Sequence, residues 1–180
     1  AQIGNIVKVH YTLKDNDDKL CDLNTLSLPD YSDFDLSAYP LLPAFTSRGC
    51  VYRCSFCAET VYWKRYNRKS AEKVADDFEK LHRVYGKHLY VLTDCLINPL
   101  VTPLSEELIK RGMQIYWDVY IKVDDRVCDP EYTHLWRRGG FYRSRLGIES
   151  GSQRVLDMID KQISIQQIRD ALTALATAGI

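Results

Sequence analysis

The sequence predicts an α/β protein built on a parallel sheet, and three observations lead to this fold class. Short runs rich in β-branched and aromatic residues alternate with helical patterns from residue 45 onward. The runs 87–94, 113–123 and 141–150 begin 26–28 residues apart, about the length of one strand–helix unit. The helical patterns between them carry their own start and stop residues. Strands that alternate with helices in this way form a parallel sheet, either open or curled into a barrel.

The first two helices are predicted from their punctuation. Ser70 is a capping residue for a helix that follows it, and Gly86 can end that helix in a left-handed turn. For the next helix, Thr102 is the expected cap, Pro103 the expected first helical residue and Gly112 the expected end. We therefore expect one helix just before the run 87–94 and another between that run and the run 113–123.

The later helices follow the same scheme. Asp129 and Pro130 predict the start of a third helix, and Gly139 its end. Ser164 and Gln167 stand at the spacing of a capping box and predict the start of a fourth. The sequence therefore predicts four helices that alternate with the strands.

The number of repeating units bounds the architecture. A short strand over 44–47 ("AFTS") precedes the three runs, which gives about four strand–helix units. A complete eight-unit barrel needs about 250 residues. The sequence therefore predicts either a small open sheet or part of a (β/α) barrel.

Residues 1–44 differ in composition from the rest. The stretch "NIVKVHYTL" alternates apolar and polar residues before "KDNDDK", which indicates a possible hairpin. Pro29, Pro40 and Pro43 then interrupt any regular element. We expect an irregular N-terminal arm or linker over 1–44 and the core domain over 45–180.

Composition excludes several classes of protein. Lys and Arg together number 24, as do Asp and Glu, so the net charge of zero implies no general attraction to nucleic acid or anionic membrane. No apolar run approaches the roughly 20 residues that span a bilayer. The start lacks the basic-then-apolar layout of a signal peptide. A cytoplasmic protein with reduced thiols is the expectation.

Three of the six cysteines lie within eight positions in "TSRGCVYRCSFC". Cys50, Cys54 and Cys57 are one thiol short of a closed structural zinc site, and the nearest histidines are 25 or more residues away along the chain. Cysteine thiolates are the usual ligands of iron–sulfur clusters, and three on one loop can hold three irons and leave a fourth open. Zinc and chance clustering remain as alternatives. The other cysteines, Cys21, Cys95 and Cys128, are expected to be ordinary core or loop residues.

This motif resembles a known family. The spacing CX3CX2C, with Phe56 as the aromatic residue before the last cysteine, resembles the signature of the radical S-adenosylmethionine (radical SAM) superfamily. The stretches 65–86 and 147–161, together with the arm "LPDYSDFDLSAYP", resemble the subgroup that carries a cobalamin-binding domain upstream of the barrel. The resemblance covers roughly residues 26–180. It implies a partial (β/α) barrel of six units, of which this chain would hold about four, as a fragment without the cobalamin-binding domain.

The resemblance also implies a chemistry and a set of site residues. Cys50, Cys54 and Cys57 match the ligands of a 4Fe–4S cluster whose open iron binds S-adenosylmethionine. One electron passed through such a cluster yields a 5′-deoxyadenosyl radical. Phe56 matches the aromatic residue beside the adenine. Glu149 and Ser150, expected at the end of the fourth strand, match the polar stretch that contacts the bound nucleoside.

Two segments depart from the family pattern or are ambiguous. Thr93, Asp94 and Cys95 stand where many relatives have two acidic residues followed by Asn, so a role in the site and a structural role are both open. Lys122 stands where relatives often have Arg and could pair with the methionine carboxylate, but a solvated lysine is the simpler interpretation. The basic aromatic stretch 62–70 permits a nucleic-acid interpretation that the zero net charge disfavours.

The predicted function is therefore the radical-generating core of a cobalamin-dependent radical SAM methyltransferase or related oxidoreductase. A radical SAM methylthiotransferase is the alternative within enzymes, and a non-catalytic metal-binding fragment is the alternative outside them. The implied partners are an unidentified substrate and an electron donor such as a flavodoxin or ferredoxin. Neither membrane nor nucleic acid is expected as a partner.

Overall fold

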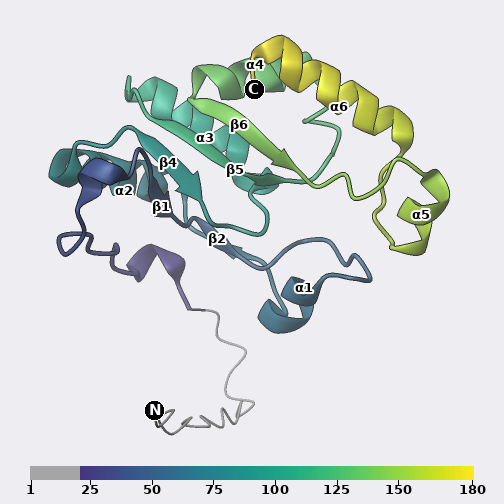
Figure 1. Cartoon of the computed structure of the whole chain (residues 1–180), viewed down its shortest axis with the longest axis horizontal. Helices are drawn as coiled ribbons and strands as arrows, with labels where there is room; N and C mark the ends of the chain where they lie inside the picture. The colour runs from purple at the N-terminus through teal and green to yellow at the C-terminus, as the bar shows by residue number, and fades with distance from the viewer. Residues whose placement is uncertain (1–20) are drawn as a thin grey trace, which may run out of the picture.

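A four-stranded parallel sheet organises the chain (Figure 1). The structure, a computed structural model, describes residues 21–180, so the hairpin expected before them lies outside the described residues. Each strand pairs in parallel with its neighbour, in the order β1-β4-β5-β6. The strands are β1 (Leu42–Ala44), β4 (Leu89–Leu92), β5 (Tyr116–Ile121) and β6 (Phe141–Leu146).

Four helices form a layer beside this sheet. They pack in chain order, each against the next: α2 (Ala71–Tyr85), α3 (Asn98–Lys110), α4 (Pro130–Arg138) and α6 (Ile165–Ala178). The short helices α1 (Ala58–Trp63) and α5 (Gln153–Met158) lie apart from the layer, on the side toward which β6 points (Figure 1). A small antiparallel pair, β2 (Ser47–Arg48) and β3 (Asn67–Arg68), lies next to the first of them in the chain.

The predicted fold class is confirmed. The described residues contain four parallel strands that alternate with helices in an open sheet, which agrees with part of a (β/α) barrel. The first strand begins two residues before its predicted start: it covers Leu42–Ala44, and the prediction was 44–47. Phe45 and Thr46 leave the sheet, and Ser47 already pairs in antiparallel fashion with Arg68.

The helix predicted to begin at Pro103 begins five residues earlier, at Asn98. Leu100 and Val101 are buried, and their burial favours helix over this extra turn. The Asn98 side chain bonds both backbone groups of Lys122, with distances of 2.7 Å to the carbonyl oxygen and 2.9 Å to the amide nitrogen. Pro103 lies inside the helix, so the start predicted at Thr102 and Pro103 was wrong, whereas Gly112 follows the last turn with a left-handed φ of 64° as expected.

The other predicted caps are confirmed. Ser70 Oγ accepts a hydrogen bond from the Lys73 amide at 3.1 Å, and Gly86 is left-handed with φ of 66°. Asp129 caps α4 through the Glu131 amide at 2.8 Å. Both reciprocal bonds of the capping box at the start of α6 are present.

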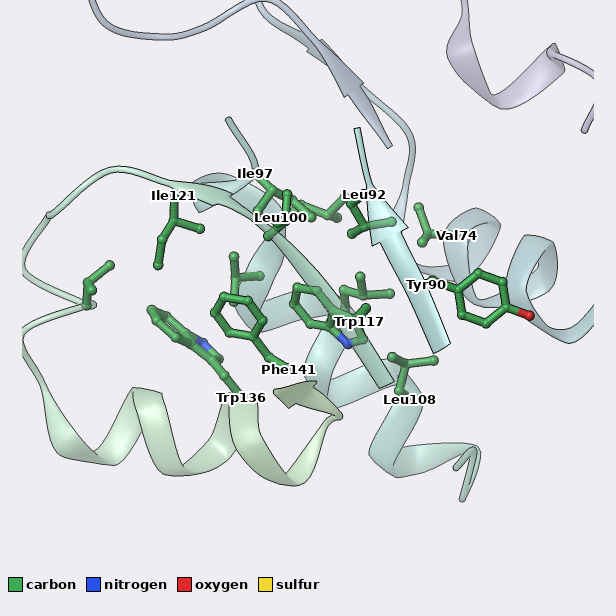
Figure 2. Packing of buried hydrophobic residues seen from close by; sticks show 14 of the residues in the cluster. Val74, Tyr90, Leu92, Ile97, Leu100, Leu108, Trp117, Ile121, Trp136 and Phe141 are labelled. Carbon is green, nitrogen blue, oxygen red and sulfur yellow. The ribbon is translucent and has the colours of Figure 1, made fainter. Parts of the chain in front are cut away.

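The core lies between the sheet and the helix layer (Figure 2). Trp117 of β5 stacks on Phe141 of β6 with ring centroids 4.6 Å apart, and both side chains are fully buried. The indole N–H of Trp117 donates to the Gly139 carbonyl at 3.0 Å, and that of Trp136 donates to Thr102 Oγ1 at 3.0 Å. Both polar atoms are therefore satisfied inside an apolar core.

The N-terminal arm contacts the base of this core. It contains two short 3-10 helices, η1 (Leu23–Thr25) and η2 (Leu36–Ala38). The Tyr31 amide donates to the Tyr85 hydroxyl at 2.8 Å, and the Lys87 ammonium donates to the Leu36 carbonyl at 2.6 Å. Within residues 21–180, none of the helices has both the length and the apolarity to cross a membrane.

Candidate iron–sulfur site

The cysteine loop, residues 45–57, follows β1, includes the short strand β2 and continues into α1. Gly49 takes a left-handed conformation there, with φ of 78°, one residue before the first cysteine. A Cβ atom at this position would lie 2.3 Å from the carbonyl oxygen of Arg65, which belongs to the returning chain. Only glycine fits this close backbone approach, so it fixes the path of the loop.

Asp94, which follows β4, fixes the start of the loop through hydrogen bonds. Its buried carboxylate accepts hydrogen bonds from the Thr46 amide at 2.8 Å, from the Thr46 hydroxyl at 3.0 Å and from the Ser47 amide at 2.5 Å. Burial raises the pKa of this carboxyl group, while the bonds from Ser47 and Thr46 oppose the shift. The sequence left the role of Asp94 open, and the structure gives it a structural role at the base of the cysteine loop.

The three clustered thiols are free and half-buried on this loop. The Cys57 amide donates to the Cys54 carbonyl at 3.0 Å, which closes a turn between the two. The Tyr52 amide donates to Cys50 Sγ at 3.4 Å. Burial raises the pKa of Cys50, the Tyr52 amide lowers it, and the charges of Cys57 and Cys54 raise it further. Cys50 thus lies within electrostatic reach of the other two thiols.

The chemistry of the donor set, three cysteine thiols on one loop, fits a 4Fe–4S cluster. Among residues 21–180, no three Cys, His, Asp or Glu side chains converge closely enough to hold one ion. Three thiolates on three different irons of a cubane stand farther apart than three thiolates on one tetrahedral zinc. Thiolate sulfur is the ligand that such clusters take, and all three sulfurs are available.

The segment after β6 meets the cysteine loop. The Ser55 amide donates to the Ile159 carbonyl at 3.0 Å, which ties the loop to the end of α5. The Lys161 ammonium lies 2.9 Å from Glu149 Oε1 and 5.7 Å from the centroid of the Phe56 ring. Two segments about a hundred residues apart in the sequence therefore share one rim of the sheet, as the parallel strands predict.

Glu149 and Ser150 lie beyond the strand where they were expected to stand. β6 ends at Leu146, and Glu149 has a left-handed backbone with φ of 65°. The hydroxyl of Ser150 accepts a hydrogen bond from the Ser152 amide at 3.1 Å, at the start of α5. The sequence also missed Lys161, which is buried and pairs with the Glu149 carboxylate.

Lys122 is not the solvated lysine that the simpler interpretation expected. The residue is only 5% exposed, and its ammonium lies 3.5 Å from the centroid of the Tyr52 ring. Burial lowers its pKa, and the nearby charges of Cys54 and Cys50 act in the opposite direction. The chain therefore places a cation against the cysteine loop, held by an aromatic face.

Cys95 lies on the other side of the loop. Its thiol donates to Glu59 Oε2 at 2.9 Å, and burial followed by this hydrogen bond raises its pKa to about 12. Both residues line a hollow of about 610 Å³ between α1 and the end of β4. The hollow is further lined by Ser47, Arg48, Ala58, Tyr62, Trp63 and Thr93. Cys21 is exposed, and the Cys128 thiol donates to the Gln167 carbonyl at 3.3 Å.

These features match one protein family. The sequence model described as "Radical SAM superfamily" matches residues 45–180, which is most of the chain. The chain therefore belongs to the radical SAM superfamily. This membership implies a 4Fe–4S cluster and S-adenosylmethionine as cofactors, and it agrees with the three-cysteine motif of the loop.

Individual relatives place the chain more closely. It is 32% identical over 142 residues to the anaerobic magnesium-protoporphyrin IX monomethyl ester cyclase of Rubrivivax gelatinosus, and the match covers 77% of this chain and 25% of the relative. The chain spans about a quarter to a third of the curated relatives it matches. Among solved structures, the cobalamin-dependent S-adenosylmethionine radical enzyme OxsB with aqua-cobalamin and S-adenosylmethionine bound is similar, with a TM-score of 0.65 and 24% identity over 78% of this chain and 22% of that chain.

A second solved structure has the same fold. It is the radical S-adenosylmethionine methyltransferase TsrM from Kitasatospora setae with tryptophan and a SAM analogue bound. Its TM-score is 0.66 and its identity 21%, and the match covers 78% of this chain and 29% of that chain. The likeness to both structures supports the same partial-barrel fold for this chain.

Proposed function

We propose that this chain is the radical-generating core of a cobalamin-dependent radical SAM enzyme. The single observation that carries the proposal is the meeting of two segments at the carboxyl rim of the sheet. The loop with Cys50, Cys54 and Cys57 stands there against the segment with Glu149, and Lys161 contacts both sides. Parallel α/β proteins place their chemistry at this rim.

The proposed cofactor site uses the residues of both segments. Cys50, Cys54 and Cys57 would hold a 4Fe–4S cluster, which when bound supplies an electron that cleaves S-adenosylmethionine to a 5′-deoxyadenosyl radical. Phe56 is 54% exposed, so its backbone is accessible to a bound adenine. Glu149 and Ser150 would accept hydrogen bonds from the nucleoside.

Two buried lysines complete this side of the site. Lys161 holds the Glu149 carboxylate at 2.9 Å and so restricts its rotamers. Lys122 is fixed over the Tyr52 ring, where its charge is available for the carboxylate of a bound methionine group. These side chains bind and orient the cofactor, and their burial reduces the entropy lost when it binds.

The net reaction is proposed from the relatives. A methyl transfer or a related oxidative cyclisation is supported by the chain's similarity to a cyclase and to a methyltransferase structure. The cobalamin in the similar OxsB structure supports cobalamin as a second cofactor of the intact protein. We propose a cytoplasmic enzyme that takes its electron from a flavodoxin or ferredoxin, and nucleic acid is not part of the proposal.

The test is spectroscopic. Protein purified anaerobically and reconstituted with iron and sulfide should give the electron paramagnetic resonance signal of a reduced 4Fe–4S cluster. S-adenosylmethionine should change that signal, because the ligands change at one iron of the four. A verified cluster that does not respond to S-adenosylmethionine would contradict the proposed function. Zinc without sulfide would favour a non-catalytic metal site.

A further inference from the structure

The face of the sheet opposite the core carries a group of charged residues on β5 and β6. Side chains alternate between the two faces of a strand, so Trp117 and Val119 point to the core while Asp118 and Tyr120 point the other way. The register pairs Asp118 with Arg143 and Tyr120 with Arg145. The four side chains therefore lie together on the face that would line the inside of the partial barrel.

Asp118 holds both arginines at once. The residue is fully buried, and Arg143 Nε donates to its Oδ2 at 2.7 Å, with Nη2 of the same guanidinium as a second donor. Arg145 Nη2 lies 3.0 Å from Oδ1 of the same carboxylate. The guanidinium carbons also lie against aromatic rings, 5.6 Å from the centroid of Tyr142 for Arg143 and 5.2 Å from that of Tyr120 for Arg145. Both cations are thus positioned before any ligand arrives.

The charges of this group do not balance. One carboxylate faces two guanidinium groups, so the group carries an excess positive charge. A guanidinium has five N–H donors, and Asp118 engages only a minority of those on the two arginines. The side chains of Arg143 and Arg145 remain 52% and 33% exposed, so their remaining donors are accessible on the open face.

A purely structural role explains one arginine better than two. A buried carboxylate needs a cation, because an unpaired buried charge costs several kcal/mol. Arg143 already supplies two donors to Asp118. Arg145 adds a second full charge next to the first, and the single Asp118 carboxylate between them neutralises only one of the two. The excess charge therefore points to a ligand.

The position of the pair fits a substrate of the proposed site. Arg145 precedes Glu149 by four residues, which at about 3.3 Å per residue places their Cα atoms at most about 13 Å apart. Glu149 stands at the rim where the nucleoside is proposed to bind. A small molecule held at the arginines can therefore extend along the strand to the rim.

We propose that Arg143 and Arg145 bind an anionic group of the substrate, a phosphate or a carboxylate, on the inner face of the sheet. The substrate class is then a small phosphorylated or carboxylated molecule, and the inference rests on the proposed function. The planar guanidinium fork matches both oxyanions through paired N–H donors. Asp118, behind the pair, orients the two forks and does not touch the ligand.

The experiment uses inorganic phosphate as the probe on cluster-reconstituted protein at constant ionic strength, with binding followed by calorimetry. Arg143→Gln and Arg145→Gln should each weaken phosphate binding about tenfold, since each removes charge-assisted hydrogen bonds. Arg138→Gln is the matched control, because Arg138 is an exposed arginine on α4, in the helix layer. Equal phosphate affinity in the Arg145→Gln and Arg138→Gln variants would overturn the proposal.

A second measurement distinguishes the substrate's anion from the carboxylate of S-adenosylmethionine. The affinity for S-adenosylmethionine, read from the cluster spectrum, should stay within about twofold in both Gln variants. A loss equal to that for phosphate would assign the pair to S-adenosylmethionine and overturn the proposal. Failure of the unmodified protein to respond to S-adenosylmethionine would contradict the proposed function instead, and the phosphate titration would still be readable.

The fold of each variant needs a check, because each substitution removes one of the two cationic partners of the buried Asp118. Circular dichroism and thermal unfolding provide it. If the Gln variants do not fold, Arg145→Lys keeps the charge beside Asp118 and removes only the fork. It should weaken phosphate binding severalfold, and an affinity equal to that of Arg138→Gln would overturn the proposal.

Discussion

The helix-covered core and the cysteine loop are held in place by different forces. In the core, Trp117 and Phe141 are fully buried and stack at 4.6 Å, so apolar area removed from water supplies most of the stability. The cysteine loop buries little apolar surface. It is fixed by the Asp94 carboxylate, by the left-handed turn at Gly49 and by the bond from Ser55 to Ile159.

This difference separates stability from cofactor binding. Because many small contacts share the stability of the core, a large change there lowers the free energy of unfolding for the whole domain. A change in the loop removes a few directional contacts and alters the site while the domain stays folded. Substitutions in the two regions should therefore fail in different assays, and the four predictions below test this separation.

The largest effect is expected for the cysteines of the loop. Cys54→Ala removes one of three thiolates and leaves two, which cannot hold a cubane. Iron and sulfide content after anaerobic reconstitution should fall to background, and the same should follow for Cys50→Ala and Cys57→Ala. Thermal unfolding of the metal-free protein should change little, because these side chains are only half-buried.

Cysteines elsewhere provide the controls for this prediction. Cys21 is exposed, and Cys128 bonds to a backbone carbonyl near α6. Ala at either position should leave the iron content unchanged. A full cluster in the Cys54→Ala variant would show that the three-cysteine assignment is wrong.

The next largest effect is expected in the core. Trp117→Ala removes a fully buried indole and its hydrogen bond to Gly139. The loss should be about 3–5 kcal/mol of unfolding free energy, or roughly 6–20 °C in Tm. Leu172→Ala on α6 is the control, because Leu172 is 48% exposed and its truncation should shift Tm very little. An unchanged Tm for Trp117→Ala would mean that the core is not packed as described.

A smaller and more local effect is expected at Asp94. Asp94→Asn keeps the shape, but its amide group replaces an acceptor with donors that face the Thr46 and Ser47 amides. The opening free energy of the loop base should fall by about 2–4 kcal/mol, which speeds hydrogen exchange at these two amides by roughly 30- to 700-fold. Asp35→Asn changes an exposed turn aspartate and should leave both amides protected. Equal exchange rates in the two variants would show that Asp94 does not stabilise the base of the loop.

Most of the fold was predictable because it depends on local signals. The caps at Ser70, Asp129 and Ser164 are short-range patterns with a defined geometry, and each is confirmed. The start of α3 was not predictable from its prolines. Burial of Leu100 and the contact between Asn98 and Lys122 are tertiary, and they outweigh the preference of Pro103 for the first turn.

The candidate site divides in the same way. The cysteines are a contiguous motif, so the sequence alone predicts their chemistry. Lys161 and Asp94 act through partners that lie 12 and 48 residues away along the chain, and no local pattern marks them. The burial of Lys122 likewise depends on Tyr52 covering it, a contact between the cysteine loop and the end of β5.

The smallest effect is expected at Glu149. Its carboxylate is held by Lys161 at 2.9 Å, and its backbone φ is 65°. Glu149→Gln keeps the backbone strain and the shape but removes the charge, and with it the ion pair to Lys161, so it should lower the affinity for S-adenosylmethionine. That loss should be about 1–3 kcal/mol if the carboxylate accepts a hydrogen bond from the nucleoside.

The cluster itself distinguishes this role from a structural one. Glu149 is not among the proposed iron ligands, so iron content and the spectrum without S-adenosylmethionine should match those of the unmodified protein. Gln153→Ala on the neighbouring α5 serves as the control, because the Gln153 side chain bonds Asp157 and the Ile163 carbonyl. The contact between Lys161 and Phe56 does not involve it. Unchanged affinity in Glu149→Gln would leave its carboxylate as a partner of Lys161 only and would place nucleoside recognition on backbone groups of the segment after β6.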